Sequence, residues 1–91
     1  MQLRKQVKTL SNVSYSMAAG LALKHLIRKH YPSQQSFADD YGIELRTVNR
    51  YVTSGIGKMV TIEEAADFFQ MDVIDFLRLG KSLAEESEMF R

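Results

Sequence analysis

Apolar residues recur along this chain at the spacing of an α-helix, and no segment alternates apolar and polar residues as a half-buried strand would. The first strong stripe runs from about residue 16 to residue 30 and covers more than one face, which predicts a helix buried on two sides. Ser14 or Ser16 can cap this helix, and Pro32 ends it. Gly20 lies inside it and costs about 1 kcal/mol relative to alanine, so we expect close packing at that point.

Four shorter helices are predicted after Pro32. Their limits follow from residues that favour helix ends, which are serine, threonine or aspartate at the start and glycine at the stop. The predicted elements are Gln34–Tyr41 between Ser33 and Gly42, a helix from about Leu45 to Val52 or Thr53, a helix that Thr61 and Glu64 begin as a capping box, and a helix that Asp72 begins and Gly80 ends.

The two ends of the chain leave alternatives open. Residues 1–12 carry a weak stripe of Leu3, Val7 and Leu10, which fits either a helix or an arm. The tail at 81–91 fits either a short helix or a frayed end. We therefore predict one small all-α domain, because 91 residues leave no room for a second core. Its parts are an N-terminal arm or extra helix at 1–14, the helical domain at 15–80 and the tail at 81–91.

Charge is unevenly distributed along the chain. The net charge is only +1, but residues 1–60 hold nine Lys/Arg and three Asp/Glu, whereas residues 61–91 hold three and eight. This polarity predicts a basic face for a polyanion and an acidic end that faces solvent or a partner. The chain contains no run of about 18 apolar residues and no signal-peptide pattern, so we expect a cytoplasmic protein without a membrane span.

The residue types needed for catalysis or metal binding are sparse. The sequence has no cysteine, which excludes disulfides and cysteine-based metal sites. His25 and His30 are five positions apart and do not share a helical face as a metal pair would. No nucleophile and base can be paired from the sequence. We therefore expect no catalytic residues, no metal, no cofactor and no enzyme activity.

Two short helices separated by a three-residue turn that contains glycine form the pattern of a helix–turn–helix. In the second of them, Val48 and Tyr51 are three positions apart and anchor one side, while Ile43 fills the corner of the turn. No acidic residue within this helix lies three or four positions from either of its arginines. The side chains expected to point away from the core are those of Arg46, Asn49 and Arg50.

The segments SQQSFADDYGIELRTVNRYVTSG at 33–55 and TIEEAADFFQMDVIDFL at 61–77 resemble the Cro/repressor-type (XRE-like) helix-turn-helix DNA-binding family. The second segment matches the two helices that follow the motif in that family, and the helix at 16–30 stands where the first helix would. The resemblance implies a compact five-helix lambda-repressor-like DNA-binding domain with its motif at 33–53. It also implies a homodimeric transcription regulator of bacterial or phage type that binds double-stranded DNA sequence-specifically.

The resemblance also implies roles for individual residues, because the third helix of that family enters the major groove of DNA. Arginine can donate two hydrogen bonds to guanine, and asparagine can pair in the same way with adenine. The positions that match base-reading residues are Leu45, Arg46, Thr47, Asn49 and Arg50. The positions that match phosphate-contacting residues are Gln34, Glu44, Thr53, Ser54 and Lys58. Further phosphate contacts are expected from Arg4, Lys5, Lys8, Arg28 and Lys29 in some combination.

Several residues depart from the pattern of that family. Glu44 stands where a serine or threonine usually caps the reading helix, and Asp39 and Asp40 add negative charge to the preceding helix. Val52 is apolar where the family is commonly charged, so Val52 and Ile56 are candidates for a partner contact. These departures favour an alternative, a protein-interaction module on the same fold (antitoxin-like or anti-regulator) with weak or no DNA binding. Candidate dimer surfaces are the N-terminal segment, residues 81–91 and the region 52–60.

Overall fold

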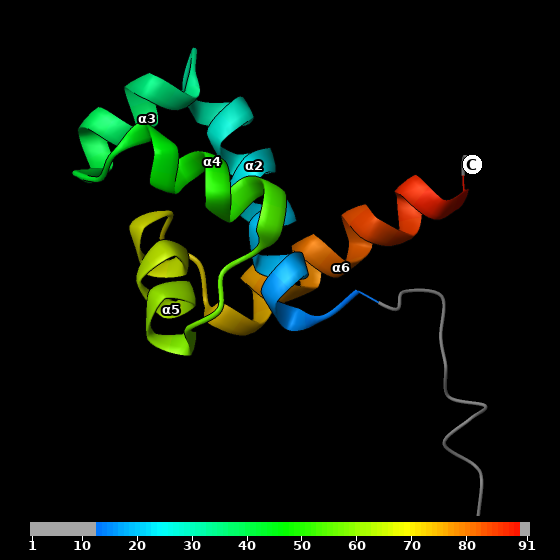
Figure 1. The fold of residues 1–91 in the computed structure, drawn as a ribbon. Helices are drawn as coiled ribbons and strands as arrows, with labels where there is room; N and C mark the ends of the chain where they lie inside the picture. The colour runs from blue at the N-terminus through cyan, green and yellow to red at the C-terminus, as the bar shows by residue number, and fades with distance from the viewer. Residues whose placement is uncertain (1–12, 90–91) are drawn as a thin grey trace, which may run out of the picture.

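The computed structural model describes residues 13–89 of the chain, with side chains through residue 87, as five helices without a strand (Figure 1). This confirms the predicted all-α class for the described residues, while the stripe of Leu3, Val7 and Leu10 lies outside them. The helices are α2 (Tyr15–His30), α3 (Gln34–Tyr41), α4 (Leu45–Ser54), α5 (Met59–Phe68) and α6 (Val73–Met89).

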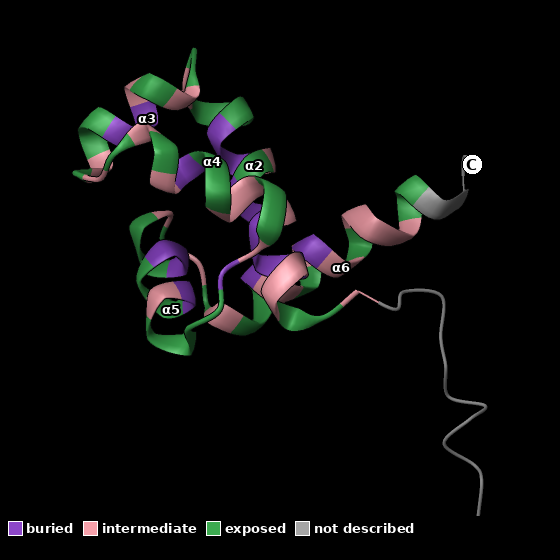
Figure 2. Ribbon diagram, viewed as in Figure 1, coloured by how far each residue is buried: buried purple, intermediate pink, exposed green. Residues whose placement is uncertain are grey.

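Helix α2 is the centre of the fold. Ser14 caps it, because its side-chain oxygen accepts a hydrogen bond from the Met17 backbone N–H at 3.1 Å. The helix packs against α6 over its longest contact and also contacts α3 and α4. Figure 2 shows buried positions along α2 and on the inner sides of its neighbours. Its buried residues, which confirm the prediction of two-sided burial, are Ala18, Ala19, Gly20, Ala22, Leu23, Leu26 and Ile27.

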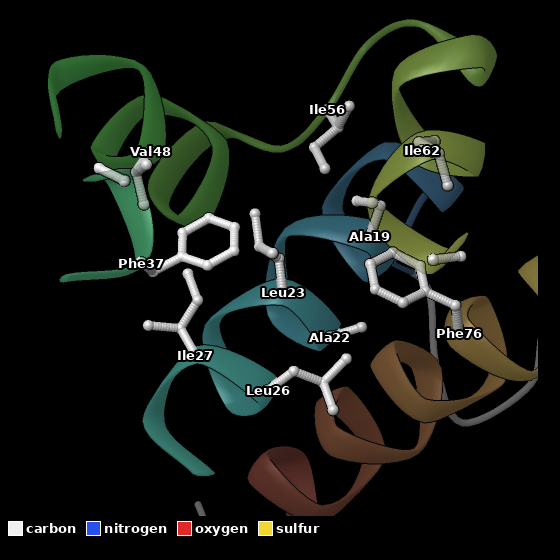
Figure 3. Packing of buried hydrophobic residues seen from close by; sticks show 13 residues of the cluster. Ala19, Ala22, Leu23, Leu26, Ile27, Phe37, Val48, Ile56, Ile62 and Phe76 are labelled. Atoms are coloured by element: carbon white, nitrogen blue, oxygen red, sulfur yellow. The ribbon is translucent and has the colours of Figure 1, made fainter. Parts of the chain in front are cut away.

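The hydrophobic core joins all five helices and the loop between α4 and α5. Figure 3 shows Leu23 and Ile27 of α2 beside Phe37 of α3, and Phe76 of α6 beside Ala19. Full burial of a side chain of this size stabilises the fold by roughly 1.5–3 kcal/mol. The largest side chains with almost no exposed surface are Phe37, Phe76, Leu23, Ile27, Ile56 and Val48.

Two glycines occupy positions that the sequence marked for them. A Cβ atom on Gly20 would lie 2.4 Å from the backbone oxygen of Tyr51, so this glycine lets α2 and α4 approach closely, as predicted. Gly42 ends α3 with a φ of 89°, a left-handed conformation that residues with a Cβ adopt at a cost. Its backbone N–H donates to the Ala38 oxygen at 2.8 Å.

The capping box predicted for α5 is wrong. The helix begins at Met59, and Lys58 occupies the cap position without a side-chain cap bond. Thr61 lies inside the first turn, and its own backbone N–H donates to the Lys58 oxygen at 3.1 Å. The reason lies upstream, where Ile56 is buried and donates its N–H to the Ser16 oxygen at 3.1 Å. This anchor brings the chain to the start of α5 before Thr61 is reached.

Helix α6 begins as predicted, because Asp72 accepts a hydrogen bond from the Ile74 N–H at 3.3 Å. The predicted stop at Gly80 is wrong, since α6 continues to Met89 without interruption. Gly80 is buried against α2, and a Cβ atom at this position would lie 1.8 Å from the Ala18 oxygen. Residues 81–89 are therefore the second half of α6, and in Figure 1 this half extends beyond the other helices.

Candidate nucleic-acid interface

Helices α3 and α4 are held together by a turn of three residues, Gly42–Glu44. The Ile43 N–H donates to the Ala38 oxygen at 3.1 Å, which closes the corner over a fully buried Ala38. Val48 anchors the inner side of α4 and has no exposed surface. Because the inner side is buried in this way, the opposite side of α4 faces away from the core.

The exposed side of α4 carries hydrogen-bond donors. Arg46, Asn49 and Arg50 are exposed, as predicted, while Leu45 and Thr47 are half-buried at the margin of this face. The Arg50 guanidinium lies 5.6 Å from the ring centroid of Tyr51, within the range of a cation–π contact. Within residues 13–87, no carboxylate forms an ion pair with Arg46 or Arg50. We call the five residues Leu45, Arg46, Thr47, Asn49 and Arg50 the α4 face.

No side chain caps the N-terminus of α4. The Glu44 oxygen accepts hydrogen bonds from the N–H groups of Thr47 at 3.0 Å and Val48 at 3.2 Å. The Glu44 carboxylate makes no cap bond and is exposed. The positive end of the helix dipole therefore faces solvent beside one free carboxylate. The helix N-terminus and the Glu44 carboxylate therefore lie together at the first turn of the α4 face.

The loop after α4 brings a second cation to the end of this helix. Arg50 and Lys58 line one hollow of about 240 Å³, together with Tyr51, Gly55, Ile56, Gly57 and Thr61. Both cations are exposed, so the hollow combines two positive charges with the threonine hydroxyl. Sequence reasoning placed Lys58 among the phosphate contacts but missed the shared hollow and its Thr61. The two loop glycines are the only sequence signal for it.

The remaining candidates for phosphate contacts differ in exposure and in whether their side chains already form hydrogen bonds within the protein. Thr53 is exposed, but its hydroxyl donates to the Asn49 oxygen at 2.7 Å, so its donor is occupied within α4. Ser54 is exposed at the end of α4. Gln34 begins α3 and is half-buried, and its side chain hydrogen-bonds to no residue in the described part of the chain. Ser54 and Gln34 therefore have donors without a partner in the described residues, and the Ser54 donor is the more exposed of the two.

The two aspartates of α3 are engaged within the fold. Asp39 accepts a hydrogen bond from the Gln35 side chain at 2.8 Å, and Asp40 accepts one from the Tyr31 hydroxyl at 2.6 Å. The hydrogen bond to Asp40 raises the pKa of Tyr31, and partial burial adds to the effect. Both carboxylates thus have a neutral hydrogen-bond donor within the fold and keep their negative charge.

The expectation of a partner contact is wrong for Ile56, whereas for Val52 it stays a prediction. Ile56 is only 1% exposed, and Val52 is half-buried and packs against the core. Ile56 holds the loop between α4 and α5 against α2 through the bond from its N–H to the Ser16 oxygen, so it is not free for a partner. The exposed apolar residues of the region 52–60 are Met59 and Val60 at the start of α5.

None of the helices in residues 13–89 combines the length and apolar character that crossing a membrane requires. Within the same residues, no three His, Cys, Asp or Glu side chains gather closely enough to hold a metal ion. In comparisons with known proteins, no family model, no curated protein and no solved structure matches this chain.

Proposed function

We propose that this protein is a sequence-specific double-stranded-DNA-binding transcriptional regulator that reads the major groove with α4. The observation that carries the proposal is the α4 face, on which Arg46, Asn49 and Arg50 are exposed without an acidic partner. A guanidinium fits the O6 and N7 acceptors of guanine, and an amide fits the N6 and N7 groups of adenine. A helix of this width fits the major groove.

Phosphate contacts beside the α4 face supply affinity and orientation. The hollow shared by Arg50 and Lys58 offers two cations at the end of α4, where the DNA backbone would pass. Arg28 and Lys29 are exposed in the last turn of α2 and are two further cations that can contact phosphate. Each phosphate that these cations neutralise makes binding more dependent on salt.

Two residues at the first turn of α4 set the specificity. The Glu44 carboxylate repels phosphate, but it can accept a hydrogen bond from the N4 amino group of cytosine. Leu45 is half-buried and can contact a thymine methyl group. We therefore expect the preferred site to combine cytosine or thymine at the Glu44 end with guanine and adenine along Arg46, Asn49 and Arg50.

Two copies are expected to act together. A single module of this size buries a modest interface with DNA, and two-fold-related half-sites double the contacts. A homodimer on a symmetric site is therefore part of the proposal. Half-sites about one helical turn apart, or multiples of it, match this arrangement.

The test is a selection of bound sequences from a random pool of double-stranded DNA, followed by binding measurements across salt concentrations. We expect one enriched half-site, repeated with two-fold symmetry, and an affinity that falls steeply with salt. No enrichment, together with no binding at about 50 mM salt, would sink the proposal.

The second candidate is a protein-interaction module of the antitoxin or anti-regulator type. Residues 61–91 hold three Lys/Arg and eight Asp/Glu, so the C-terminal third of the chain is acidic. That balance favours a basic protein partner over a polyanion. The same selection distinguishes the candidates, because a pure interaction module enriches no DNA sequence.

A further inference from the structure

An apolar groove lies where the N-terminus of α2, the start of α5 and the first half of α6 meet. Its volume is about 520 Å³. It shares no lining residue with the hollow beside α4 and contains no residue of the α4 face. The residues that line it are Tyr15, Met59, Val73, Ile74, Leu77, Arg78 and Lys81.

Several large apolar side chains that leave much of their surface in solvent gather at the groove. Tyr15, Met59 and Ile74 each leave half or more of their surface in solvent, and Val60 does so directly beside Met59. Of the five large hydrophobic residues exposed in the described part of the chain, three line the groove. Apolar side chains gathered in one place in this way mark an interaction site.

Contacts of Lys81 fix the shape of the groove on the side where α2 meets α6. Its Nζ donates to the Val13 oxygen at 3.0 Å and lies 4.6 Å from the ring centroid of Tyr15. These two contacts hold the start of α2 against the middle of α6. A partner would therefore meet a groove that needs little reorganisation before binding.

The outward face of α6 changes its charge along the helix. Ile74, Arg78, Lys81 and Glu85 follow one another at helical spacing and share the side opposite the buried Phe76. On this face the groove-lining residues Arg78 and Lys81 are basic and Glu85, one turn further on, is acidic, while Asp75 adds a carboxylate to the first turn of α6. The outward face of α6 therefore carries both signs of charge, positive beside the groove and negative beyond it.

The charges decide which occupant suits the groove. The chain's own segment 1–12 carries Arg4, Lys5 and Lys8 without an acidic residue, so Arg78 and Lys81 repel it. The acidic second half of α6 extends beyond the other helices (Figure 1), and the groove of its own molecule lies beside the first half of the same helix. A second copy of the chain can bring this acidic half to the groove.

We propose that the groove is the dimer interface of this protein, in which the α6 helices of two copies pack antiparallel. Arg78 of each copy then faces Glu85 of the other, and the apolar groove of each copy is covered by the second half of its partner's α6. The same contact occurs twice about a two-fold axis, as in an isologous dimer. Parallel packing is disfavoured, because it places like charges opposite one another.

The overlap is long enough for a stable contact. Residues 74–89 of α6 span about 24 Å at 1.5 Å per residue, which is about four turns of each helix. The inference deepens the proposed function, since it names the surface that joins the expected two copies. It leaves the α4 face uncovered on both copies, so DNA binding and dimerisation can be tested separately.

The test measures the mass of the full chain in solution without DNA, by sedimentation equilibrium. We expect a dimer for the wild type and at least a tenfold weaker dimer for Arg78→Glu and for Glu85→Arg. The double variant Arg78→Glu/Glu85→Arg restores the opposite charges and should regain most of the lost affinity. Lys24→Glu reverses an exposed charge of α2 outside the groove and serves as the matched control.

Ile74→Asp tests the apolar part of the groove independently of the charge pair and should also yield a monomer. Circular dichroism of each variant confirms that the helices are retained. A wild type that stays monomeric at a concentration on the order of 0.1 mM overturns the inference. Folded single variants that dimerise like the wild type also overturn it, as does a folded double variant that stays monomeric. An intact dimer that binds no DNA defeats the proposed function and leaves this inference standing.

Discussion

Gly80 of α6 lies directly against the backbone of Ala18 in α2, so closely that a Cβ atom at position 80 would come within 1.8 Å of the Ala18 oxygen. This contact is the point at which the two longest helices of the described residues cross. The absence of a side chain at position 80 therefore sets how near α6 lies to the centre of the fold.

Gly80→Ala should lower the free energy of unfolding by about 2–3 kcal/mol, because α6 must shift away from Ala18 to make room. In an isolated helix the same change would stabilise by about 1 kcal/mol, so the sign of the effect separates packing from propensity. Gly57→Ala is the control, because a Cβ atom there meets nothing within 4 Å. Urea unfolding of both variants provides the measurement. Equal stability of the two variants would contradict the contact.

Gly42 and Gly55 both have positive φ angles, 89° and 95°, with ψ angles of 31° and 175°. A Cβ atom on Gly42 meets open space, whereas one on Gly55 would lie 2.6 Å from the Ser16 hydroxyl oxygen. Gly42→Ala should therefore cost only the conformational strain, about 1–2 kcal/mol. Gly55→Ala should cost more, because the loop must also leave α2. Thermal and urea unfolding rank the two variants, and a Gly42→Ala cost that exceeds the Gly55→Ala cost would refute this explanation.

Glu44→Ser should stabilise α4 and alter DNA binding in one step. A serine at this cap position can accept a hydrogen bond from a free N–H group of the first turn, which is worth about 0.5–1 kcal/mol. The change also removes the negative charge at the first turn of the α4 face. We expect higher stability in urea and tighter binding to non-specific DNA at low salt. Glu63→Ser on the outer side of α5 is the control, since it removes the same charge at an exposed position away from α4.

Arg46→Ala and Arg50→Ala should relax the sequence preference at one base pair each, with a loss of about 1–3 kcal/mol for the best site. Lys58→Ala should weaken binding to all sequences alike. The slope of log affinity against log salt concentration should fall by about 1, which corresponds to one lost phosphate contact. Competition binding with the selected site and its single-base variants separates the two patterns. If all three substitutions weaken every sequence equally, α4 contacts phosphate only and does not read bases.

Tyr31→Phe should lower stability at neutral pH by about 1 kcal/mol, because it removes the hydrogen bond to Asp40. The pKa of Tyr31 is raised above its ordinary value of 10.0 in the folded protein. Its stabilising contribution is therefore complete below pH 10 and is lost as the pH rises through the folded value. Unfolding measured from about pH 8 to pH 11 should show the variant and the wild type converging. In an Asp40→Ala background, Tyr31→Phe should have little effect at any pH.

The local signals in the sequence determined much of the fold. Ser14, Ser33 and Asp72 cap their helices as predicted, and Gly42 makes the predicted left-handed turn. The exposed side of α4 also followed from the sequence, because Val48 marks the buried side by its periodicity. Caps and turns are stabilised by hydrogen bonds between residues three or four positions apart. The buried side of a helix follows from the fixed repeat of about 3.6 residues per turn. Both are properties of a short stretch of chain.

Only the tertiary structure decided what Gly80, Thr61 and Ile56 do. The residue type at each of these positions is compatible with two local structures, and a contact with a residue distant in sequence determines which of the two forms. At Gly80 the helix α6 continues, because the missing side chain lets it pack against the backbone of Ala18. Ile56 is buried, because the bond from its N–H to the Ser16 oxygen holds the loop against α2. Thr61 loses its cap role because that anchor starts α5 earlier. The physical reason is that packing free energy from a distant contact exceeds the local preference of about 1 kcal/mol that a cap or a helix stop provides.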